Sequence, residues 1–501
     1  MSPWTRRNFL MSGTAAAALP LSTSDALAEL ADVDGTDPVA LAAAMIRFDT
    51  SQSGRGSTDT GTGAVTLPHA QFLERIWQAA GVATEIIPTP QENNVHFLAR
   101  VKGKGTKPPL LFTAHSDVVT VERDNWTQDP YGGTVSDGWL YGRGAVDMKG
   151  AAAVFMAALL RHVKAGTAFD RDVLFLSDCD EEGGSFGAQW LVDNHYDKVR
   201  AGTVITEGGW TLAGKDGSTP VLASLTCRDR TSMLVALTAR GTATHTSHPD
   251  NNQAMPRLGR AVERLRGYRP SIRLTPLSRE YFTELAQHTD DRRFAAALRA
   301  MLAASSQSEL DSAGAEVIRC STHPWVHQPM LGTTLSFIGL QAGLYTGIIP
   351  SRAQAHVRIG FLPDGDDPAK CVADLRKLLV ADQVDLTVVG RPGEPENDVI
   401  NRVRAALARP PSTLDTDVYA MWRKAVSETY PGAGSAPSQF EAATSAGPWR
   451  AKGIPVYGLY PYTVDGDTVT RMHGTDERIR TQALVAGTDL VHRMLAQLRV
   501  G

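Results

Sequence analysis

Short apolar runs of strand length alternate with helix-like stretches along the first half of this chain. The runs are rich in Val, Leu, Ile and Phe, and they occupy 95–101, 109–119, 172–178 and 202–209. The stretch 149–166 repeats apolar residues at helical spacing and closes on Gly166. Such alternation predicts an α/β domain with a largely parallel sheet, in which ligands gather at the carboxyl ends of the strands.

The pattern changes near Thr231. Apolar and polar residues alternate at 231–241, 333–343 and 354–363, as in half-exposed strands, and helices are expected near 254–267 and 368–381. This predicts a smaller α+β domain inserted into the first, with the polar stretch 278–320 as an insertion inside it. The expected division is 29–229 and 393–501 for the α/β domain, and 230–392 for the inserted domain.

The N-terminus predicts export. Arg6 and Arg7 precede an uncharged stretch, 9–21, and Ala26-Leu27-Ala28 then offers a small-x-small cleavage site. The apolar stretch is too short to span a bilayer. The segment resembles a twin-arginine signal. We therefore expect a signal peptide over 1–28 and a periplasmic or secreted mature protein without a stable membrane anchor.

Composition excludes some partners and constrains the thiols. A formal net charge of -4 over 501 residues gives no reason to expect nucleic acid or an anionic membrane as a partner. The cysteines are far apart and lack C-x-x-C spacing: Cys179, Cys227, Cys320 and Cys371. We expect buried free thiols, although one disulfide remains open in an oxidising compartment.

Imidazoles and carboxylates cluster where predicted strands end or loops follow them. These residues are His115, Asp117, Asp147, Glu181, Glu182, Glu207 and His473. A mixed set of this kind suits zinc or a similar divalent ion. It exceeds the needs of one tetrahedral site and fits two ions about 3.5–4 Å apart that share a carboxylate.

The motifs that carry these residues occur in a specific order: HSDVV, DGWLYGRGAVDMKG, DEEGG, TEGG and HGTDE. In this order they resemble the M20 metallopeptidase and aminoacylase family, which includes the carboxypeptidase G2, succinyl-diaminopimelate desuccinylase, acetylornithine deacetylase and aminoacylase-1 types. The resemblance runs from His115 to His473. It implies a zinc-peptidase-like α/β catalytic domain, an inserted lid or dimerisation domain, and a homodimer.

The resemblance also implies a role for each metal-binding residue. His115 and Glu207 would bind one divalent ion, and Glu182 and His473 the other. Asp147 would bridge the two ions from a turn that often contains a cis peptide. Zinc is the expected metal, with cobalt and manganese as alternatives.

Three further residues receive catalytic roles from the same resemblance. Asp117 would orient His115, a role that alternate side chains on one strand face also allow. Glu181 would take a proton from the attacking water and pass it to the leaving amine. His245, in the segment GTATHTSHPD, would reach across a dimer and stabilise the oxyanion in the partner's site. For His248 we expect a surface position.

The chain departs from the family pattern where a substrate carboxylate would be held. Gly347 replaces the usual Asn, and Gly360 stands where an Arg is usual. Arg358 lies two residues earlier on the same strand face and is a candidate substrate-binding residue, since a guanidinium suits a carboxylate. A solvated strand residue is the alternative. Trp449, Tyr460 and Tyr462 are candidates for the pocket wall or for the core.

These features favour a dinuclear metal-dependent hydrolase that cleaves an amide bond. A carboxypeptidase or dipeptidase acting on a small peptide, and an N-acyl-amino-acid deacylase, remain open because both use the same metal centre. An exported binding protein with an inactive enzyme fold is a third hypothesis. A mononuclear zinc protease does not fit, because the chain lacks H-E-x-x-H.

Overall fold

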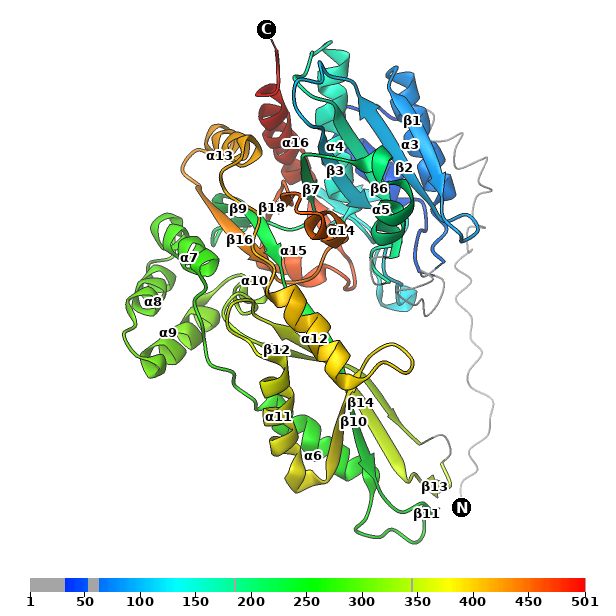
Figure 1. The fold of residues 1–501 in the computed structure, drawn as a ribbon, viewed down its shortest axis with the longest axis vertical. Helices are drawn as coiled ribbons and strands as arrows, with labels where there is room; N and C mark the ends of the chain where they lie inside the picture. The colour runs from blue at the N-terminus through cyan, green and yellow to red at the C-terminus, as the bar shows by residue number, and fades with distance from the viewer. Residues whose placement is uncertain (1–31, 53–62, 184–185, 344–345, 501) are drawn as a thin grey trace.

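The structure, a computed structural model, describes residues 32–52, 63–183, 186–343 and 346–500. A ten-stranded sheet forms the larger domain (Figure 1). Its path is β1 (Ala83–Pro88), β2 (Val95–Val101), β6 (Val173–Asp178), β3 (Leu110–His115), β7 (Thr203–Thr206), β17 (Val456–Gly458), β9 (Pro220–Asp229), β8 (Thr211–Ala213) and β18 (Thr463–Val464), with β16 (Gly434–Phe440) beside β9. The central strands β6, β3, β7 and β17 run parallel, as the sequence predicts.

Helices cover both faces of this sheet. One core contains residues of α2 (Pro38–Ile46), α3 (Leu67–Ala79), α4 (Lys149–Lys164) and α16 (Thr481–Ala496). A second core on the opposite face contains residues of α5 (Phe186–Val199) and α14 (Gly447–Ala451). Phe112 of β3 belongs to the first core and its neighbour Leu111 to the second. Burial on both faces explains why these strands are continuous apolar runs.

The smaller domain is an antiparallel sheet with helices on one face, and the predicted α/β domain with an inserted α+β domain is confirmed. The strand order is β12 (Thr334–Ala342), β14 (Arg352–Phe361), β10 (Thr231–Arg240) and β15 (Val384–Val389). Residues of α6 (Ala254–Arg266), α11 (Pro368–Leu379) and α12 (Glu396–Leu407) complete its core. Alternate residues of β14 are buried against these helices, which matches the period-two pattern in the sequence.

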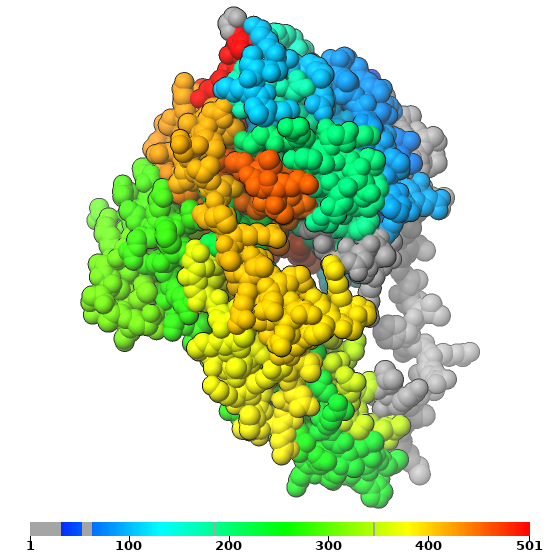
Figure 2. Space-filling model, viewed as in Figure 1, coloured from blue at the N-terminus to red at the C-terminus, as the bar shows by residue number. Residues whose placement is uncertain are grey.

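Packing divides the chain differently from the expected boundaries in two places. The core of the smaller domain extends through Leu407, beyond residue 392, because α12 buries Val399 and Val403 in it. The stretch 278–320 lies outside that domain: α7 (Pro276–His288), α8 (Arg292–Ala303) and α9 (Gln307–Cys320) form a lobe beside β16 and β9 (Figures 1 and 2). Phe282 of α7 and Phe440 of β16 share the core of the larger domain.

A small three-stranded sheet shapes one side of the larger domain. Its order is β19 (Arg478–Arg480), β5 (Trp139–Tyr141) and β4 (Thr134–Ser136). The pairing of β19 with β5 brings the loop after α15 (Gly466–Arg471) beside the loop before α4. Earlier in the chain, α13 (Asp417–Thr429) packs on α16.

The export prediction for 1–28 falls outside the described residues. Within the residues that the structure does describe, no helix is long and apolar enough to cross a membrane. The cysteines are free thiols, three of them buried and Cys320 partly exposed.

Candidate metal centre

The carboxyl ends of three neighbouring parallel strands bring the first part of the site together. His115 is the last residue of β3 and pairs in register with Asp178, the last residue of β6, from which Glu181 and Glu182 follow. Glu207 comes directly after β7, on the other side of β3. Because parallel strands end at one edge of the sheet, residues 92 positions apart in sequence share one site.

Two glycines explain why Glu207 turns into the site. Gly208 and Gly209 have φ values of 108° and 70°, which side chains other than hydrogen rarely allow. A Cβ at Gly209 would lie 2.4 Å from the carbonyl oxygen of Gly458 and 2.5 Å from that of Ser224. The TEGG motif therefore lets the chain reverse tightly against two neighbouring strands.

The small sheet supplies the remaining ligand candidates. Asp147 lies in the loop between β5 and α4, and its peptide bond to Met148 is cis, as the resemblance implies. His473 lies in the loop between α15 and β19, in a left-handed conformation with φ 63°. The β5–β19 pairing therefore places His473 beside Asp147 although 326 positions separate them.

Asp147 joins two groups of ligand atoms. Its Oδ1 is 3.0 Å from Nε2 of His115, and its Oδ2 is 3.3 Å from Nε2 of His473. Beyond these contacts, Nε2 of His115 is 3.8 Å from Oε2 of Glu207, and Nε2 of His473 is 2.9 Å from Oε1 of Glu182. We call the His115–Asp147–Glu207 group the first half-site and the His473–Asp147–Glu182 group the second half-site.

The donor set fits two divalent ions. Ligands about 2.0–2.2 Å from one zinc ion lie roughly 3–4 Å from one another, as these atoms do. Glu207 also has a buried Oε1 without a hydrogen-bond partner. Four carboxylates face two imidazoles here, and divalent cations supply the charge that such a cluster requires.

The pKa values reflect this crowding. Although burial opposes it, hydrogen bonds from His115 and His473 hold the pKa of Asp147 well below its usual value. Burial and the nearby negative charge of Asp147 raise the pKa of Glu207 to about 7, although the contact with His115 opposes this shift. Burial disfavours the charged imidazole of His473, but the Asp147 and Glu182 carboxylates raise its pKa to about 11.

Asp117 supports the site in two ways. Its backbone carbonyl accepts from Nδ1 of His115 at 2.9 Å, whereas its carboxylate Oδ1 is 3.7 Å from that nitrogen. The carboxylate instead accepts from the backbone N–H groups of Glu181 and Glu182, at 2.9 and 3.0 Å. Asp117 thus orients the imidazole through its main chain and anchors the acidic loop through its side chain.

Glu181 lies in the same cluster as the first half-site. One of its carboxylate oxygens is within 4.8 Å of ligand atoms from both His115 and Glu207. Burial and the neighbouring negative charge of Glu207 raise the pKa of Glu181 well above its usual value. This position beside the ligand candidates is compatible with the proton-transfer role that the sequence predicts for Glu181.

Sequence reasoning missed a buried ion pair behind Asp147. Arg143 and Glu477 pair with side chains that are 2% and 0% exposed. Oε1 of Glu477 accepts from the backbone N–H groups of Val146 and Asp147, at 2.8 and 3.2 Å. Both residues stand inside quoted motifs, GRGAVD and HGTDE, so the signal was present.

Three aromatic candidates prove to be buried side chains. Trp449 lies in the core on the α5 side and donates to the carbonyl of Val199. Tyr462 donates to the carbonyl of Val146. Tyr460 alone among the three reaches ligand atoms: its hydroxyl is 3.0 Å from Oδ1 of Asp147 and 3.2 Å from Oε2 of Glu207.

Two predicted residues lie in the smaller domain, away from this cluster. His245 and Ile348 pair in the short two-stranded sheet of β11 (Thr244–His245) and β13 (Ile348–Ile349), at the tip of that domain farthest from the large sheet (Figure 1). Both His245 and His248 are exposed. Arg358 is exposed on β14, where it donates to Ser232 at 3.1 Å.

Local packing explains the glycine at position 360. A Cβ there would lie 2.7 Å from Oγ1 of Thr334 and 3.2 Å from Nη2 of Arg230. The buried Arg230 guanidinium donates to the carbonyls of Gly332 and Gly360, at 3.0 and 2.7 Å. This second guanidinium, which comes from the β9–β10 junction, takes the space beside Gly360.

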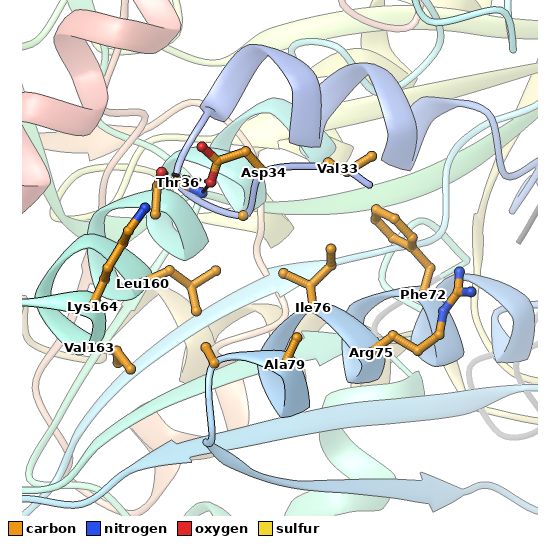
Figure 3. Close-up of a pocket in the computed structure, with 12 residues that line it drawn as sticks. Val33, Asp34, Thr36, Phe72, Arg75, Ile76, Ala79, Leu160, Val163 and Lys164 are labelled. Carbon is orange, nitrogen blue, oxygen red and sulfur yellow. Dashed lines mark hydrogen bonds between the residues drawn. The ribbon is translucent and has the colours of Figure 1, made fainter. Parts of the chain in front are cut away.

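A cavity of about 590 Å³ lies elsewhere, between residues 33–36, α3 and the end of α4 (Figure 3). Phe72, Ile76 and Leu160 line it. Since α4 begins two residues after Asp147 and the cavity reaches the helix at Leu160, about 17 Å of helix separates the cavity from the cluster. The cavity is therefore distinct from the candidate metal centre.

Comparisons with known proteins agree with this geometry. Succinyl-diaminopimelate desuccinylases from Cereibacter sphaeroides and Dinoroseobacter shibae are 34% and 32% identical to the chain over 233 and 244 residues. These matches cover 46% of this chain and 56–57% of the relatives, so the chain spans little more than half the length of the curated relatives it matches.

Solved structures share the fold. Human carnosine dipeptidase 1 superposes with a TM-score of 0.64 at 15% identity, over 96% of this chain and 99% of that chain. An M20 family metallo-carboxypeptidase from Sulfolobus solfataricus gives 0.63 at 16% identity, over 92% and 99%. Residues 111–497 match peptidase family M20/M25/M40 as a whole. The chain belongs to peptidase family M20/M25/M40.

Proposed function

We propose that this protein is a dinuclear metal-dependent hydrolase that cleaves the amide bond of a small peptide, as a carboxypeptidase or dipeptidase does. The observation that carries the proposal is Asp147, whose two carboxylate oxygens face His115 and His473 separately. Two divalent ions held there would polarise the scissile carbonyl and activate water. Glu181 would move the proton from water to the leaving amine.

N-acyl-amino-acid deacylation is the second candidate, because the curated relatives are desuccinylases. The two activities share the metal centre and differ in how the rest of the substrate is held. Arg358 is the proposed contact for a substrate carboxylate, while Arg230 occupies the space beside Gly360 and is committed to backbone carbonyls. Selection for a free carboxylate is therefore weaker than a dedicated arginine pocket would give.

A substrate panel tests both candidates. Wild type and Glu181→Gln, each loaded with zinc, cobalt or manganese, are assayed against dipeptides, N-acyl amino acids and their carboxyl-blocked forms. Zinc-supported turnover of peptides by wild type alone supports the proposal. Turnover confined to N-acyl amino acids favours the deacylase, and bound ions without hydrolysis of any substrate would overturn the enzyme hypothesis.

The proposed assembly is a homodimer formed by the smaller domains. β12 is the edge strand of its sheet, so its outer backbone groups are open to pairing. Ile338 and Leu340 are 53% and 71% exposed, and an apolar groove of about 370 Å³ lies between β12 and α6. Contiguous apolar surface on an edge strand is typical of protein interfaces. A second copy would place His245 near the partner's metal centre.

Export by the twin-arginine route is proposed on the N-terminal sequence. Such cargo is exported already folded, which agrees with a metal centre assembled from residues 358 positions apart. Replacement of both Arg6 and Arg7 by Lys should retain the protein in the cytoplasm. Continued export of this variant would show that the signal works by another route. N-terminal sequencing of the exported protein should read from near Glu29.

A further inference from the structure

The side chain of Tyr460 contacts ligand atoms of the first half-site of the candidate metal centre. It follows β17, and its backbone N–H is 2.5 Å from the carbonyl oxygen of Gly208 and 3.0 Å from that of Gly209. The side chain is fully buried. Its hydroxyl lies 3.0 Å from Oδ1 of Asp147 and 3.2 Å from Oε2 of Glu207. These are the same two oxygens that face Nε2 of His115, so the hydroxyl belongs to the first half-site.

The ring of Tyr460 is held rigidly in this place. The indole of Trp210 stacks on it with 4.3 Å between ring centroids and an interplanar angle of 19°. Nε1 of Trp210 in turn donates to Oε1 of Glu441 at 2.5 Å. Trp210 follows the two glycines after Glu207, so the same tight turn positions the ligand and the residue that fixes Tyr460.

The second half-site is supported differently. His473 and Glu182 contact each other across an exposed rim, and Asp117 anchors Glu182 through its backbone N–H. Within the described part of the chain, the Tyr460 hydroxyl is in hydrogen-bonding distance of side-chain acceptors from Asp147 and Glu207 alone. The single O–H of the phenol is shared between these two carboxylate oxygens, which restricts their rotamers before an ion arrives, and such outer contacts tune ion affinity.

We propose that Tyr460 is a positioning residue for the first half-site, and that the Trp210–Glu441 pair holds it there, so that the two ions bind with unequal affinity. This inference deepens the proposed function, because it presupposes a dinuclear centre. It concerns ion binding, however, and is measured without substrate.

Calorimetric titration of metal-free protein with zinc tests the proposal. Wild type should bind two ions in two resolved phases. In Tyr460→Phe one phase should weaken by about 10–100-fold, the range seen when such supporting contacts are removed, and the other should hold. The matched control is Tyr281→Phe, which removes an equally buried hydroxyl that lies 3.3 Å from Nε2 of His327 beside the α7 to α9 lobe, and should bind both ions as wild type does.

Double mutants that combine Tyr460→Phe with the loss of one metal-ligand residue identify the half-site on which Tyr460 acts. In a Glu207→Gln background, Tyr460→Phe should add little, because the pair acts through one carboxylate network. In a Glu182→Gln background it should keep its full effect on the remaining ion. An equal effect in both backgrounds, or wild-type affinities in Tyr460→Phe, would overturn the proposal.

Two further readouts keep the test decisive. If Tyr460→Phe does not fold, as judged by circular dichroism, Trp210→Leu removes the stacking and leaves the hydroxyl in place. Trp210→Leu should weaken the same zinc-binding phase to a smaller extent. Wild-type affinities for both ions in Trp210→Leu would count against the proposal. Wild type that binds two ions yet hydrolyses no substrate would refute the proposed function and leave the role of Tyr460 measurable.

Discussion

Glu477 and Arg143 form a buried ion pair directly behind the turn that presents Asp147. Both side chains are almost inaccessible to solvent, and the second carboxylate oxygen of Glu477 accepts the backbone N–H groups of Val146 and Asp147. One residue therefore links the small sheet, the bridging turn and the loop of His473. The Glu477 carboxylate thereby holds the backbone that presents Asp147.

Breaking this pair should destabilise the protein. Arg143→Met leaves the Glu477 carboxylate buried and uncompensated, which costs about 3–5 kcal/mol of unfolding free energy for pairs of this kind. Thermal and urea unfolding of the metal-free protein would measure the loss. Glu263→Gln, which breaks the exposed Arg266–Glu263 pair on α6, is the control and should unfold as wild type does. Equal midpoints for Arg143→Met and wild type would contradict the prediction.

The adjacent glutamates should respond unequally to substitution. Glu181→Gln should keep both ions and lower kcat by about 10²–10⁴-fold, because it removes the proton carrier. Glu182→Gln should lose affinity for the ion of the second half-site, since Glu182 contacts His473 at 2.9 Å. Metal analysis after dialysis and kcat at saturating zinc separate the two effects. Loss of an ion from Glu181→Gln would make it a ligand instead.

The role of His245 should be visible by complementation. If His245 serves the partner's site, His245→Ala and Glu181→Gln homodimers should each be nearly inactive. Mixed dimers would contain one site with both residues intact, so mixing and exchange of subunits should recover up to about a quarter of wild-type activity by random pairing. Leu340→Asp, on the exposed edge strand, should prevent both dimerisation and recovery. Recovery without dimers would rule out this arrangement.

Acid should weaken the fold through buried histidines. Burial lowers the pKa of His162 from 6.5 to about 4, although a hydrogen bond to the carbonyl of His492 opposes the shift. The unfolded chain therefore binds a proton first as the pH falls. The stabilisation is present above pH 6.5 and is lost between pH 6.5 and 4.

Urea unfolding of metal-free protein at several pH values in this window measures the effect. His162→Gln should unfold more easily at pH 7 and show a shallower decline towards pH 4 than wild type. His248→Gln, on an exposed loop, should follow the wild-type curve. A decline as steep in His162→Gln as in wild type would assign the acid sensitivity to other buried groups, such as His327.

Local patterns in the sequence were sufficient for the elements and for the ligand candidates. Continuous apolar runs predict strands buried on both faces, and the order of the motifs identifies residues that end those strands. Such information is local, because periodicity and turn chemistry act over a few residues. It therefore predicted β3 with His115 at its end, and β6 and β7 with the glutamates that follow them.

Long-range packing decided what those patterns could not. The lobe of α7 to α9 packs on the larger domain and α12 packs in the smaller domain. The amphipathic pattern of a helix shows that it has an apolar face, but not which surface that face packs against. The same holds for Arg143 with Glu477, for Tyr460 against Asp147 and Glu207, and for Arg230 beside Gly360. Each of these contacts joins residues more than a hundred positions apart, so only the closed fold brings them within hydrogen-bonding distance.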